Sequence, residues 1–324
     1  MKSSRLSTVR ALIAGAVMMP LAWGLAPSPG QASEGDVVRV GAVPVSGQTD
    51  IHVAKSLGFF EEEGVNVEIV KVRSGAEAQA AVVSGNLEVI GVNAISMILG
   101  LHEGFGFMAM ADGFRAPTED PGTSGILVRN DGAIKNPKDL EGKRLGIITR
   151  KGLHELYLDL WAGKHDVDLS KVTMIEVGYS QMVDALINDQ VDAVIPLEPF
   201  ITRGLESGKI DVLAFYDTEV DPGHANGLWV GMRKWAEANP EAATGFQNAI
   251  HRAHEYLNNN PKERLALTVE WTGLDASFVE KTGQDGFTSE MPVASMQKQA
   301  DTMHELGWLE NKVDVSDAFW KPQD

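Results

Sequence analysis

The chain contains no cysteine in its 324 residues. A protein without cysteine forms no disulfide, offers no thiolate to a metal ion, and has no cysteine nucleophile or cysteine-linked lipid anchor. Two catalytic signatures are also missing: a Gly-x-Ser-x-Gly elbow for a serine nucleophile and a Walker loop for nucleotide phosphates. These absences favour a protein that binds a partner over one that catalyses a reaction.

Basic residues are scarce beside acidic ones. Lys and Arg number 28 against 45 Asp and Glu, which gives a formal net charge of −17 at pH 7. Residues 1–32 hold three of the basic residues and no acidic one, so the rest of the chain carries −20. Such a charge argues strongly against nucleic acid and anionic membrane surfaces as partners. It also means that an anionic ligand must be held by local groups against a repulsive overall field.

The N-terminus has the pattern of a secretory signal peptide over residues 1–32. Three basic residues precede an apolar run over residues 11–25, and Gly30-Gln31-Ala32 offers a small-x-small cleavage site. The alternative, a membrane anchor, is disfavoured because the run is shorter than the roughly 20 residues that a spanning helix needs. We expect cleavage after Ala32. We also expect retention of the unanchored product in the periplasm of a cell with two membranes.

Two stretches of the chain resemble each other at a fixed offset. Residues 86–91 are matched by residues 190–195, 104 positions later, and each stretch follows a short helical pattern. Each also precedes an apolar helical stretch, and these end at Gly104 and Gly208. A repeated helix–strand–helix unit predicts two similar α/β halves. Two such halves form a cleft where the carboxyl ends of their strands meet.

Apolar runs separated by helical patterns predict two sheets. The first set of strands covers residues 37–43, 65–72, 87–92 and 107–111, with a helix from Ile51 that stops at Gly64. Its rhythm is that of a parallel sheet. The second set covers residues 126–129, 144–148, 172–177, 191–195 and 211–215, and residues 228–232 form a last strand. Turn-rich segments at 116–123 and 220–226 predict two crossings between the halves.

After Asn239 the chain is mostly helical, with one apolar helix face that includes Phe246, Ile250 and Leu257. We expect these final helices to return to the first half. The predicted organisation is a signal peptide over 1–32, a first lobe of 33–124 and 228–324, and a second lobe of 125–227.

Five motifs are spread over most of the chain after the signal peptide. They are GFFEEEG at 58–64, SGAEA at 74–78, SGNLE at 84–88, IKNPKDLEGKR at 134–144 and EPF at 198–200. In order and spacing these motifs resemble those of periplasmic solute-binding proteins of ABC importers for sulfonates, taurine, nitrate and thiamine-pyrimidine precursors.

The resemblance implies an α/β fold of the type II-like periplasmic binding protein kind. It has two parallel or mixed sheets flanked by helices, with a hinged cleft that closes on a ligand. It also implies delivery of a small organic ligand, of the anionic sulfonate, taurine or nitrate type, to a permease in the inner membrane. In one place the chain departs from the resemblance: a turn that is often Gly-Ser-Thr-like reads Thr149-Arg150-Lys151-Gly152 here.

Turns that lead from strand to helix are the predicted ligand contacts of the first lobe, because they present backbone N–H groups and the positive end of a helix dipole. Ser74 and Gly75 open the best such turn, with Ser74 either capping the helix or touching the ligand. The predicted contacts in this lobe are Ser46, Gln48, Thr49, Ser74, Gly75, Ala76 and Asn93.

Two arginines and a lysine are the predicted cationic contacts. A guanidinium forks onto a sulfonate, phosphate or carboxylate with two hydrogen bonds, which makes Arg150 the sharpest indication of an anionic ligand. Lys151 follows it, and Arg115 follows the fourth strand. The alternative is that Arg150 and Lys151 point outward on an exposed turn.

Two further residues of the second lobe complete the predicted site. Glu198 precedes Pro199, so it either stabilises the helix start or accepts from a ligand amine or pairs with Arg150. Tyr179 occupies the position of Gly75 in the repeat and is expected to face the cleft.

Other functions stay open at this point. A neutral pyrimidine-like ligand would be recognised by Glu198, Asn93 and stacked aromatic rings, and the protein could present its ligand to a sensor instead of a permease. An enzyme on the same fold, as in the related pyrimidine-forming proteins, is disfavoured because those proteins use a cysteine-containing motif. His251 and His254 have the spacing of a metal pair but are interpreted as a solvated helix edge. We therefore expect no metal ion and no cofactor. We also expect the protein to be a monomer.

Overall fold

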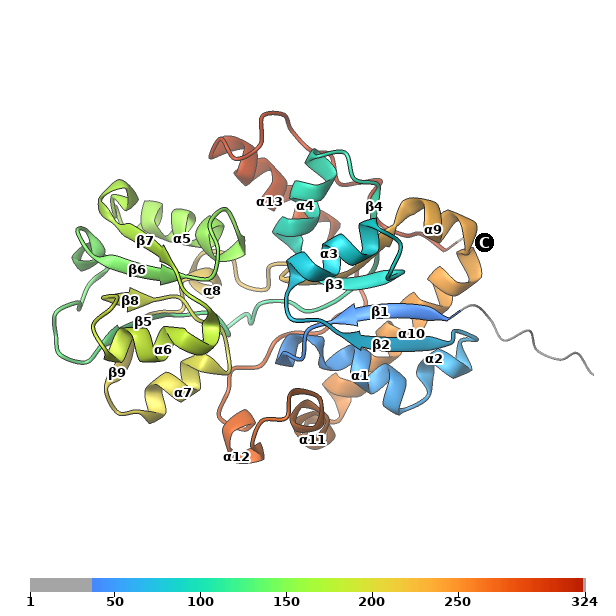
Figure 1. Cartoon of the computed structure of the whole chain (residues 1–324), viewed down its shortest axis with the longest axis horizontal. Helices are drawn as coiled ribbons and strands as arrows, with labels where there is room; N and C mark the ends of the chain where they lie inside the picture. Colours follow the sequence, from blue (N-terminus) through green and yellow to red (C-terminus); the bar gives the residue numbers. More distant parts are fainter. Residues whose placement is uncertain (1–36, 323–324) are drawn as a thin grey trace, which may run out of the picture. The chain divides into compact units, whose positions relative to one another are not determined.

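The computed structural model describes residues 37–322, so the predicted signal peptide lies outside the described residues. Two five-stranded sheets flanked by helices make up this part of the chain (Figure 1). No helix within residues 37–322 is both long and apolar enough to cross a bilayer. The predicted class, two α/β lobes each built on its own sheet, is confirmed.

The first sheet has the strand order β2-β1-β3-β10-β4. Its strands are β1 (Val38–Ala42), β2 (Val67–Lys71), β3 (Val89–Asn93), β4 (Phe107–Asp112) and β10 (Gly227–Met232). β1 runs parallel to β2 and β3, whereas β10 lies between β3 and β4 and runs antiparallel to both. The sheet is therefore mixed and not parallel throughout. The chain returns from the second lobe at the carboxyl edge of β3 and β4, so the strand formed there must run the opposite way.

The second sheet repeats this topology as β7-β6-β8-β5-β9. Its strands are β5 (Ile126–Arg129), β6 (Arg144–Ile147), β7 (Thr173–Glu176), β8 (Ala193–Val194) and β9 (Ile210–Ala214). β6 runs parallel to β7 and β8, and β5 is antiparallel to β8 and β9. Four strands, β6, β7, β8 and β9, thus end at the same edge.

The internal repeat extends to individual side chains. Helices α3 (Gly75–Val83) and α6 (Tyr179–Ile187) start and end 104 positions apart. Arg39 on β1 forks onto Glu88, with Nε 3.0 Å from Oε2 and Nη2 2.5 Å from Oε1. Arg144 on β6 forks onto Asp192 in the same way, with both contacts at 2.9 Å. Each pair fastens a strand to the turn before its parallel neighbour: β1 to the turn before β3, and β6 to the turn before β8.

Helices cover both faces of the first sheet. On one face Phe60, Trp229 and Phe246 are fully buried together, below α1 (Thr49–Ser56), α2 (Phe59–Glu62) and α10 (Pro240–Asn259). Figure 1 shows α3 and α4 (Ala94–His102) on the opposite face. Burying a large apolar side chain contributes roughly 1.5–3 kcal/mol. The predicted apolar face of α10 is buried, and the final helices do return to the first lobe.

Seven further α-helices complete the described part of the chain. They are α5 (Leu153–Lys164), α7 (Phe200–Glu206), α8 (Tyr216–Val220), α9 (Arg233–Ala238), α11 (Pro261–Thr272), α12 (Ala276–Val279) and α13 (Val293–Glu305). The single helix predicted from Ile51 to Gly64 is wrong. α1 ends at Ser56, and Gly58 adopts a left-handed conformation with φ of 75° before α2 begins.

Three segments, not two, meet where the lobes join. The predicted crossings touch, because Ala116 N donates to the His224 carbonyl over 3.0 Å. An isolated bridge also joins Ala225 to Arg115, the residue just before the first crossing. A third segment, residues 281–286, bridges to Arg115 through Gly286. It also touches the second lobe, because Gly283 N donates to Glu198 Oε1 over 3.3 Å. The lobe boundaries given above stay a prediction.

Candidate ligand-binding site

Four rings gather at the carboxyl edge of the second sheet. His154 lies in the first turn of α5 after β6, Tyr179 opens α6 after β7, Phe200 opens α7 after β8, and Tyr216 opens α8 after β9. Because β6 to β9 end at one edge, each strand-to-helix turn contributes one ring to the same place. Open α/β sheets bind their ligands at this kind of edge.

The rings are held by stacking and hydrogen bonds. Tyr179 and Phe200 stack with centroids 6.1 Å apart and planes at 14°. His154 Nε2 lies 2.6 Å from the hydroxyl oxygen of Tyr179, and its Nδ1 lies 2.5 Å from that of Tyr216. Burial lowers the pKa of His154 to about 4, so the imidazole is neutral at pH 7. Burial also raises the pKa of both tyrosines, which keeps their hydroxyls protonated.

Only Tyr179 of these four was among the predicted contacts. His154, Phe200 and Tyr216 each follow a strand by a few residues, as Tyr179 does. An aromatic or imidazole ring directly after successive strands is a signal that the sequence contains and that could have identified them.

The turn after β1 forms one corner of the first lobe's edge. Ser46 Oγ is buried and makes no hydrogen bond within residues 37–322. Gln48 Oε1 accepts from Val43 N over 2.8 Å, and its side chain lies against Gly91, where a Cβ would come within 2.4 Å of Nε2. The Thr49 hydroxyl donates to the Ser46 carbonyl over 2.8 Å and is buried. Thr49 therefore holds the turn, while Ser46 keeps a polar atom without an internal partner in the described part of the chain.

The turns after β2 and β3 are capped as the sequence suggested. Ser74 Oγ accepts from Glu77 N over 3.2 Å, and Asn93 Oδ1 accepts from Ser96 N over 2.8 Å. No heavy atom lies within 4 Å of the position that a Cβ on Gly75 would take, and Ala76 is exposed. Both caps are structural, and ligand contact by these turns stays a prediction.

Both predicted arginines are already paired inside the chain. Arg150 Nη2 lies 2.7 Å from Glu155 Oε1, and its Nε lies 3.0 Å from both carboxylate oxygens of Glu155. These hydrogen bonds raise the pKa of Arg150. Arg115 Nε lies 2.8 Å from Asp112 Oδ2, and its Nη2 donates to the Glu290 carbonyl. A ligand anion would compete with carboxylates for either guanidinium.

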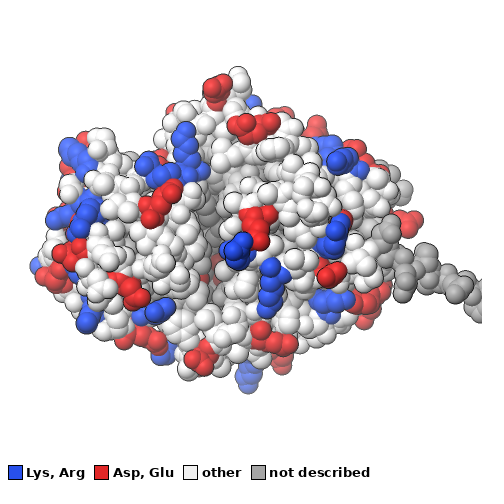
Figure 2. All heavy atoms as spheres, in the orientation of Figure 1, with Lys and Arg blue, Asp and Glu red and all other residues white. Residues whose placement is uncertain are grey.

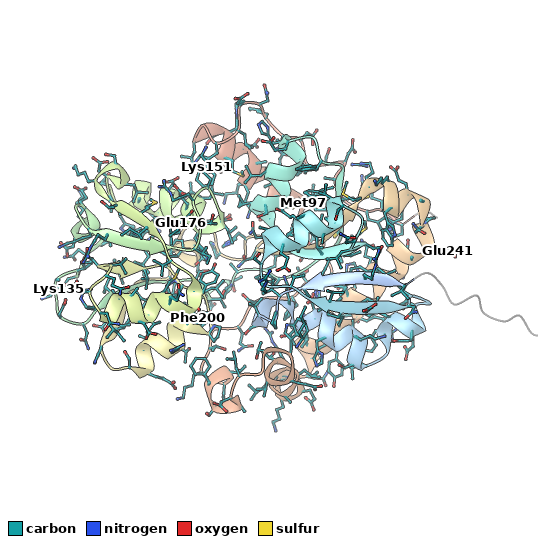
Figure 3. The ribbon with its side chains drawn as sticks, in the orientation of Figure 1. Met97, Lys135, Lys151, Glu176, Phe200 and Glu241 are labelled. Carbon is teal, nitrogen blue, oxygen red and sulfur yellow. The ribbon has the colours of Figure 1, made fainter. Side chains whose placement is uncertain are left out.

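Lys151 stands next to this pair. Its backbone N–H donates to Glu155, and its φ of 51° is in the left-handed region. Lys151 itself is exposed, and its ammonium forms no ion pair within residues 37–322. Figure 3 shows Lys151, Glu176 and Phe200 along the edge of the second sheet.

Glu198 stabilises the start of α7, which was the structural interpretation of this residue. Its carboxylate accepts from Thr202 N over 3.1 Å and from Thr202 Oγ1 over 3.0 Å. Burial raises the pKa of Glu198. Glu198 does not pair with Arg150, because Arg150 is held by Glu155.

The interpretation of His254 as part of a solvated helix edge is wrong. His254 is fully buried, with Nε2 2.9 Å from Asp50 Oδ2 and Nδ1 2.7 Å from the Thr288 carbonyl. The sequence pattern could not predict the contact between His254 and Asp50, because the two residues are 204 positions apart. Within residues 37–322 no group of three His, Cys, Asp or Glu side chains is placed to hold a metal ion.

Figure 2 shows a hollow in the visible face, with basic and acidic side chains interspersed on both sides. A pocket of about 510 Å³ lies against the crossings and the third segment, lined by residues that include Arg115, Glu119 and Phe287. Of the predicted contacts it includes only Arg115. The ring cluster at the sheet edge, which has the chemistry to recognise a ligand, is therefore the stronger candidate site.

The two sheets share one topology. Polar turns follow the strands of the first sheet, and aromatic or imidazole rings follow the strands of the second. This arrangement is that of a two-lobed solute-binding fold. The chain belongs to the NMT1/THI5-like family, whose model matches residues 46–264, more than half of the chain. The chain is similar to a putative aliphatic sulfonates-binding protein of Bacillus subtilis, with 23% identity over 82% of this chain and 80% of that protein.

It is also similar to 4-amino-5-hydroxymethyl-2-methylpyrimidine phosphate synthase of Schizosaccharomyces pombe, with 28% identity over 63% of this chain and 60% of that protein. Among solved structures, the periplasmic aliphatic sulphonate binding protein SsuA of Escherichia coli superposes with a TM-score of 0.73 and 19% identity. That match covers 88% of this chain and 97% of SsuA. This last similarity supports the two-lobed fold.

Proposed function

We propose that this chain is the solute-binding component of an ABC importer. It works in the periplasm, captures a small organic solute that carries a planar heteroaromatic ring, and delivers it to a permease in the inner membrane. It binds this solute without catalysing a reaction. The sequence favoured an anionic ligand and kept a neutral pyrimidine precursor as the alternative. The geometry of the site supports the alternative better.

The observation that carries this proposal is the ring cluster at the edge of the second sheet. Tyr179 and Phe200 stack nearly in parallel, and both are only half-buried. A ligand ring placed against an aromatic side chain gains about 0.5–1.5 kcal/mol beyond the area it buries. The ring of a heteroaromatic solute fits such a surface, whereas nitrate and taurine have no ring to place there.

The charges of the site favour the same conclusion. The side chain of Glu155 is 7% exposed, and Arg150 supplies the positive charge that balances its buried negative charge. Removing one partner of a buried ion pair costs about 3–5 kcal/mol, and the half-exposed Arg150 reduces that figure here. A charged hydrogen bond to a ligand contributes about 1.5–3 kcal/mol. An anion that drew Arg150 away from Glu155 would therefore gain little, whereas a neutral ring leaves the pair intact.

The first lobe supplies polar groups for the other side of the solute. Ser46 Oγ lacks an internal partner among the described residues, and the Asn93 amide nitrogen makes no hydrogen bond within residues 37–322. Ring nitrogens, amines and hydroxyls of a pyrimidine are suitable partners for such groups. Contacts from both lobes would make closure depend on the solute.

An anionic solute is the second candidate, and one observation favours it. The turn at Gly75 is open, and α3 presents its first N–H groups there, as an oxyanion requires. Lys151 adds a positive charge on the opposite lobe. The similarity to a sulfonates-binding relative supports this candidate as well.

A thermal-shift measurement on the chain from Ser33 onward separates the two candidates. The probes are 4-amino-5-hydroxymethyl-2-methylpyrimidine, taurine and nitrate. A ligand present at 100 times its dissociation constant stabilises the protein by about 2.7 kcal/mol. We expect the pyrimidine to raise the melting temperature and Phe200→Ala to abolish the shift. Phe105→Ala is the matched control, at a phenylalanine that is 43% exposed and whose ring packs at a tilt against Phe107. A shift with taurine or nitrate and none with the pyrimidine would establish the anionic candidate instead.

A further inference from the structure

The imidazole of His154 bridges two tyrosine hydroxyls and has no nitrogen left for anything else. Its Nε2 is 2.6 Å from Tyr179 Oη, and its Nδ1 is 2.5 Å from Tyr216 Oη. The His154 side chain is 5% exposed, so water does not replace either partner. The hydrogen bonds of the three residues are therefore linked.

The neutral state of His154 forces the two hydroxyls into opposite roles. Burial lowers the pKa of His154 to about 4, and a neutral imidazole has one N–H donor and one bare nitrogen that accepts. One tyrosine must therefore donate to the ring and the other must accept from it. Two arrangements satisfy this condition, one with the proton on Nε2 and the other with the proton on Nδ1.

The burial of Tyr216 decides between the two arrangements. Tyr216 is 0% exposed, and its hydroxyl makes no other hydrogen bond within residues 37–322. If Nδ1 carried the proton, Tyr216 would accept it and its own O–H would remain buried without an acceptor, which is costly. If Nε2 carries the proton, Tyr216 donates to Nδ1 and no buried donor is left over.

In the favoured arrangement the spare proton is on Tyr179. The Nε2–H of His154 donates to Tyr179 Oη, so the O–H of Tyr179 is not used within the cluster. Tyr179 is half-buried, at the sheet edge where the solute is expected. Because Tyr179 is not fully buried, its O–H can donate to a partner outside the cluster, in contrast to that of Tyr216.

We infer that Tyr216 and His154 act as positioning residues that make Tyr179 an obligatory hydrogen-bond donor to the solute. The inference rests on the proposed function, and it deepens it: the solute must place an acceptor, such as a ring nitrogen or a carbonyl oxygen, against Tyr179. A solute with an N–H or amino group there would leave the Tyr179 O–H without an acceptor and would bind more weakly. The run of bonds from Tyr216 through His154 to Tyr179 also strengthens the final donor, because aligned hydrogen bonds polarise one another.

Nitrogen NMR on the chain from Ser33 onward tests this without any solute. Histidines labelled with ¹⁵N report which ring nitrogen carries the proton, and the signals of His154 are assigned by their loss in His154→Gln. At pH 7 we expect a neutral ring with the proton on Nε2. A proton on Nδ1, or an imidazolium, overturns the inference.

Two variants test the role of Tyr216. In Tyr216→Phe the Nδ1 resonance of His154 should move toward that of a nitrogen that accepts no hydrogen bond. Tyr157→Phe is the matched control, because Tyr157 is equally buried in α5 but bonds to Gln299 and Asp221. The His154 resonances should be unchanged in that variant. If Tyr216→Phe leaves Nδ1 unchanged, Tyr216 does not set the proton position. If Tyr216→Phe does not fold, the wild-type tautomer still decides. All these results are independent of which solute the protein binds, so they fail or succeed separately from the proposed function.

Discussion

Arg150 Nη2 lies 2.7 Å from Glu155 Oε1, and this pair occupies the guanidinium that the sequence assigned to a ligand anion. The two residues are five positions apart, with Arg150 in the turn after β6 and Glu155 in the first turn of α5. A cation in a binding turn is therefore weak evidence for an anionic ligand when a carboxylate of the next helix can reach it.

We predict that Arg150→Ala lowers the stability of the protein. Glu155 would lose its counter-charge while its side chain stays buried, and the loss should be about 1–2 kcal/mol because Arg150 itself is half-exposed. Urea denaturation measures this change. Adding Glu155→Gln to Arg150→Ala should restore most of the stability, since the unpaired charge is then gone. If Arg150→Ala kept the stability of the wild type but lost taurine binding, Arg150 would be a ligand contact and not the partner that stabilises Glu155.

Tyr179→Phe should weaken the binding of 4-amino-5-hydroxymethyl-2-methylpyrimidine. The variant keeps the ring that stacks on Phe200 but removes one neutral hydrogen bond, so we expect a three- to tenfold increase in Kd, or about 0.5–1.5 kcal/mol. Isothermal titration calorimetry measures the difference. Tyr256→Phe, whose hydroxyl makes no hydrogen bond within residues 37–322, is the control and should bind as the wild type does. Equal affinities of Tyr179→Phe and wild type would place the hydroxyl outside the contact.

The buried carboxyl of Asp285 predicts a loss of stability as the pH rises. Burial raises the pKa of Asp285 to about 7, whereas in the unfolded chain it lies near 3.9. Between these values the unfolded state releases its proton first. The protonated Asp285 therefore contributes its full share to the free energy of unfolding below about pH 4, and this share is lost as the pH rises to about 7.

Asp285→Asn tests this because an amide does not titrate and its carbonyl oxygen can still accept from Thr123 Oγ1, which lies 2.9 Å from Oδ1. The free energy of unfolding of Asp285→Asn relative to wild type should rise between pH 4 and pH 7, by an amount on the order of 2–4 kcal/mol. Urea denaturation at several pH values measures it. The exposed Asp317→Asn should follow the wild-type profile. Parallel profiles for Asp285→Asn and wild type would refute the raised pKa.

The mature protein should begin at Ser33. Intact-mass analysis of a periplasmic extract checks this, because cleavage after Ala32 removes the first 32 residues and their three positive charges. A periplasmic protein whose mass still includes residues 1–32 would contradict the predicted signal peptide.

We also predict that the two lobes close on a bound solute. Small-angle scattering should give a smaller radius of gyration at saturation with 4-amino-5-hydroxymethyl-2-methylpyrimidine, because a solute touching both sheet edges favours the closed form. Phe200→Ala, which is expected to lose the solute, should show no change under the same conditions. An unchanged radius for a saturated wild-type protein would exclude closure.

The sequence predicted the features that depend on local pattern. The repeat at an offset of 104 correctly identified α3 and α6, and the strands were placed within a few residues, because each was an apolar run bounded by turn residues. The cap at Ser74 was predicted for the same reason.

The features that the sequence did not reveal depend on residues far apart in the chain. His154 meets Tyr216 across 62 positions, and His254 meets Asp50 across 204. The third segment that touches Glu198 has no composition that marks it as a junction, since its contact is a single backbone N–H at Gly283. Short helices such as α8, with five residues, leave too little periodicity to recognise.

The position of β10 between β3 and β4 affects the order in which the protein is built. All five strands of the second sheet lie between residues 126 and 214, so they are available to pair before residues 227–232 leave the ribosome or the export channel. The first sheet cannot be completed before β10 is available, because in the strand order of that sheet β4 neighbours only β10. Until then the edges of β3 and β4 that later pair with β10 have no partner, which makes them prone to aggregation. The first lobe is therefore completed after the second, and the export proposed above would place that last step on the far side of the membrane.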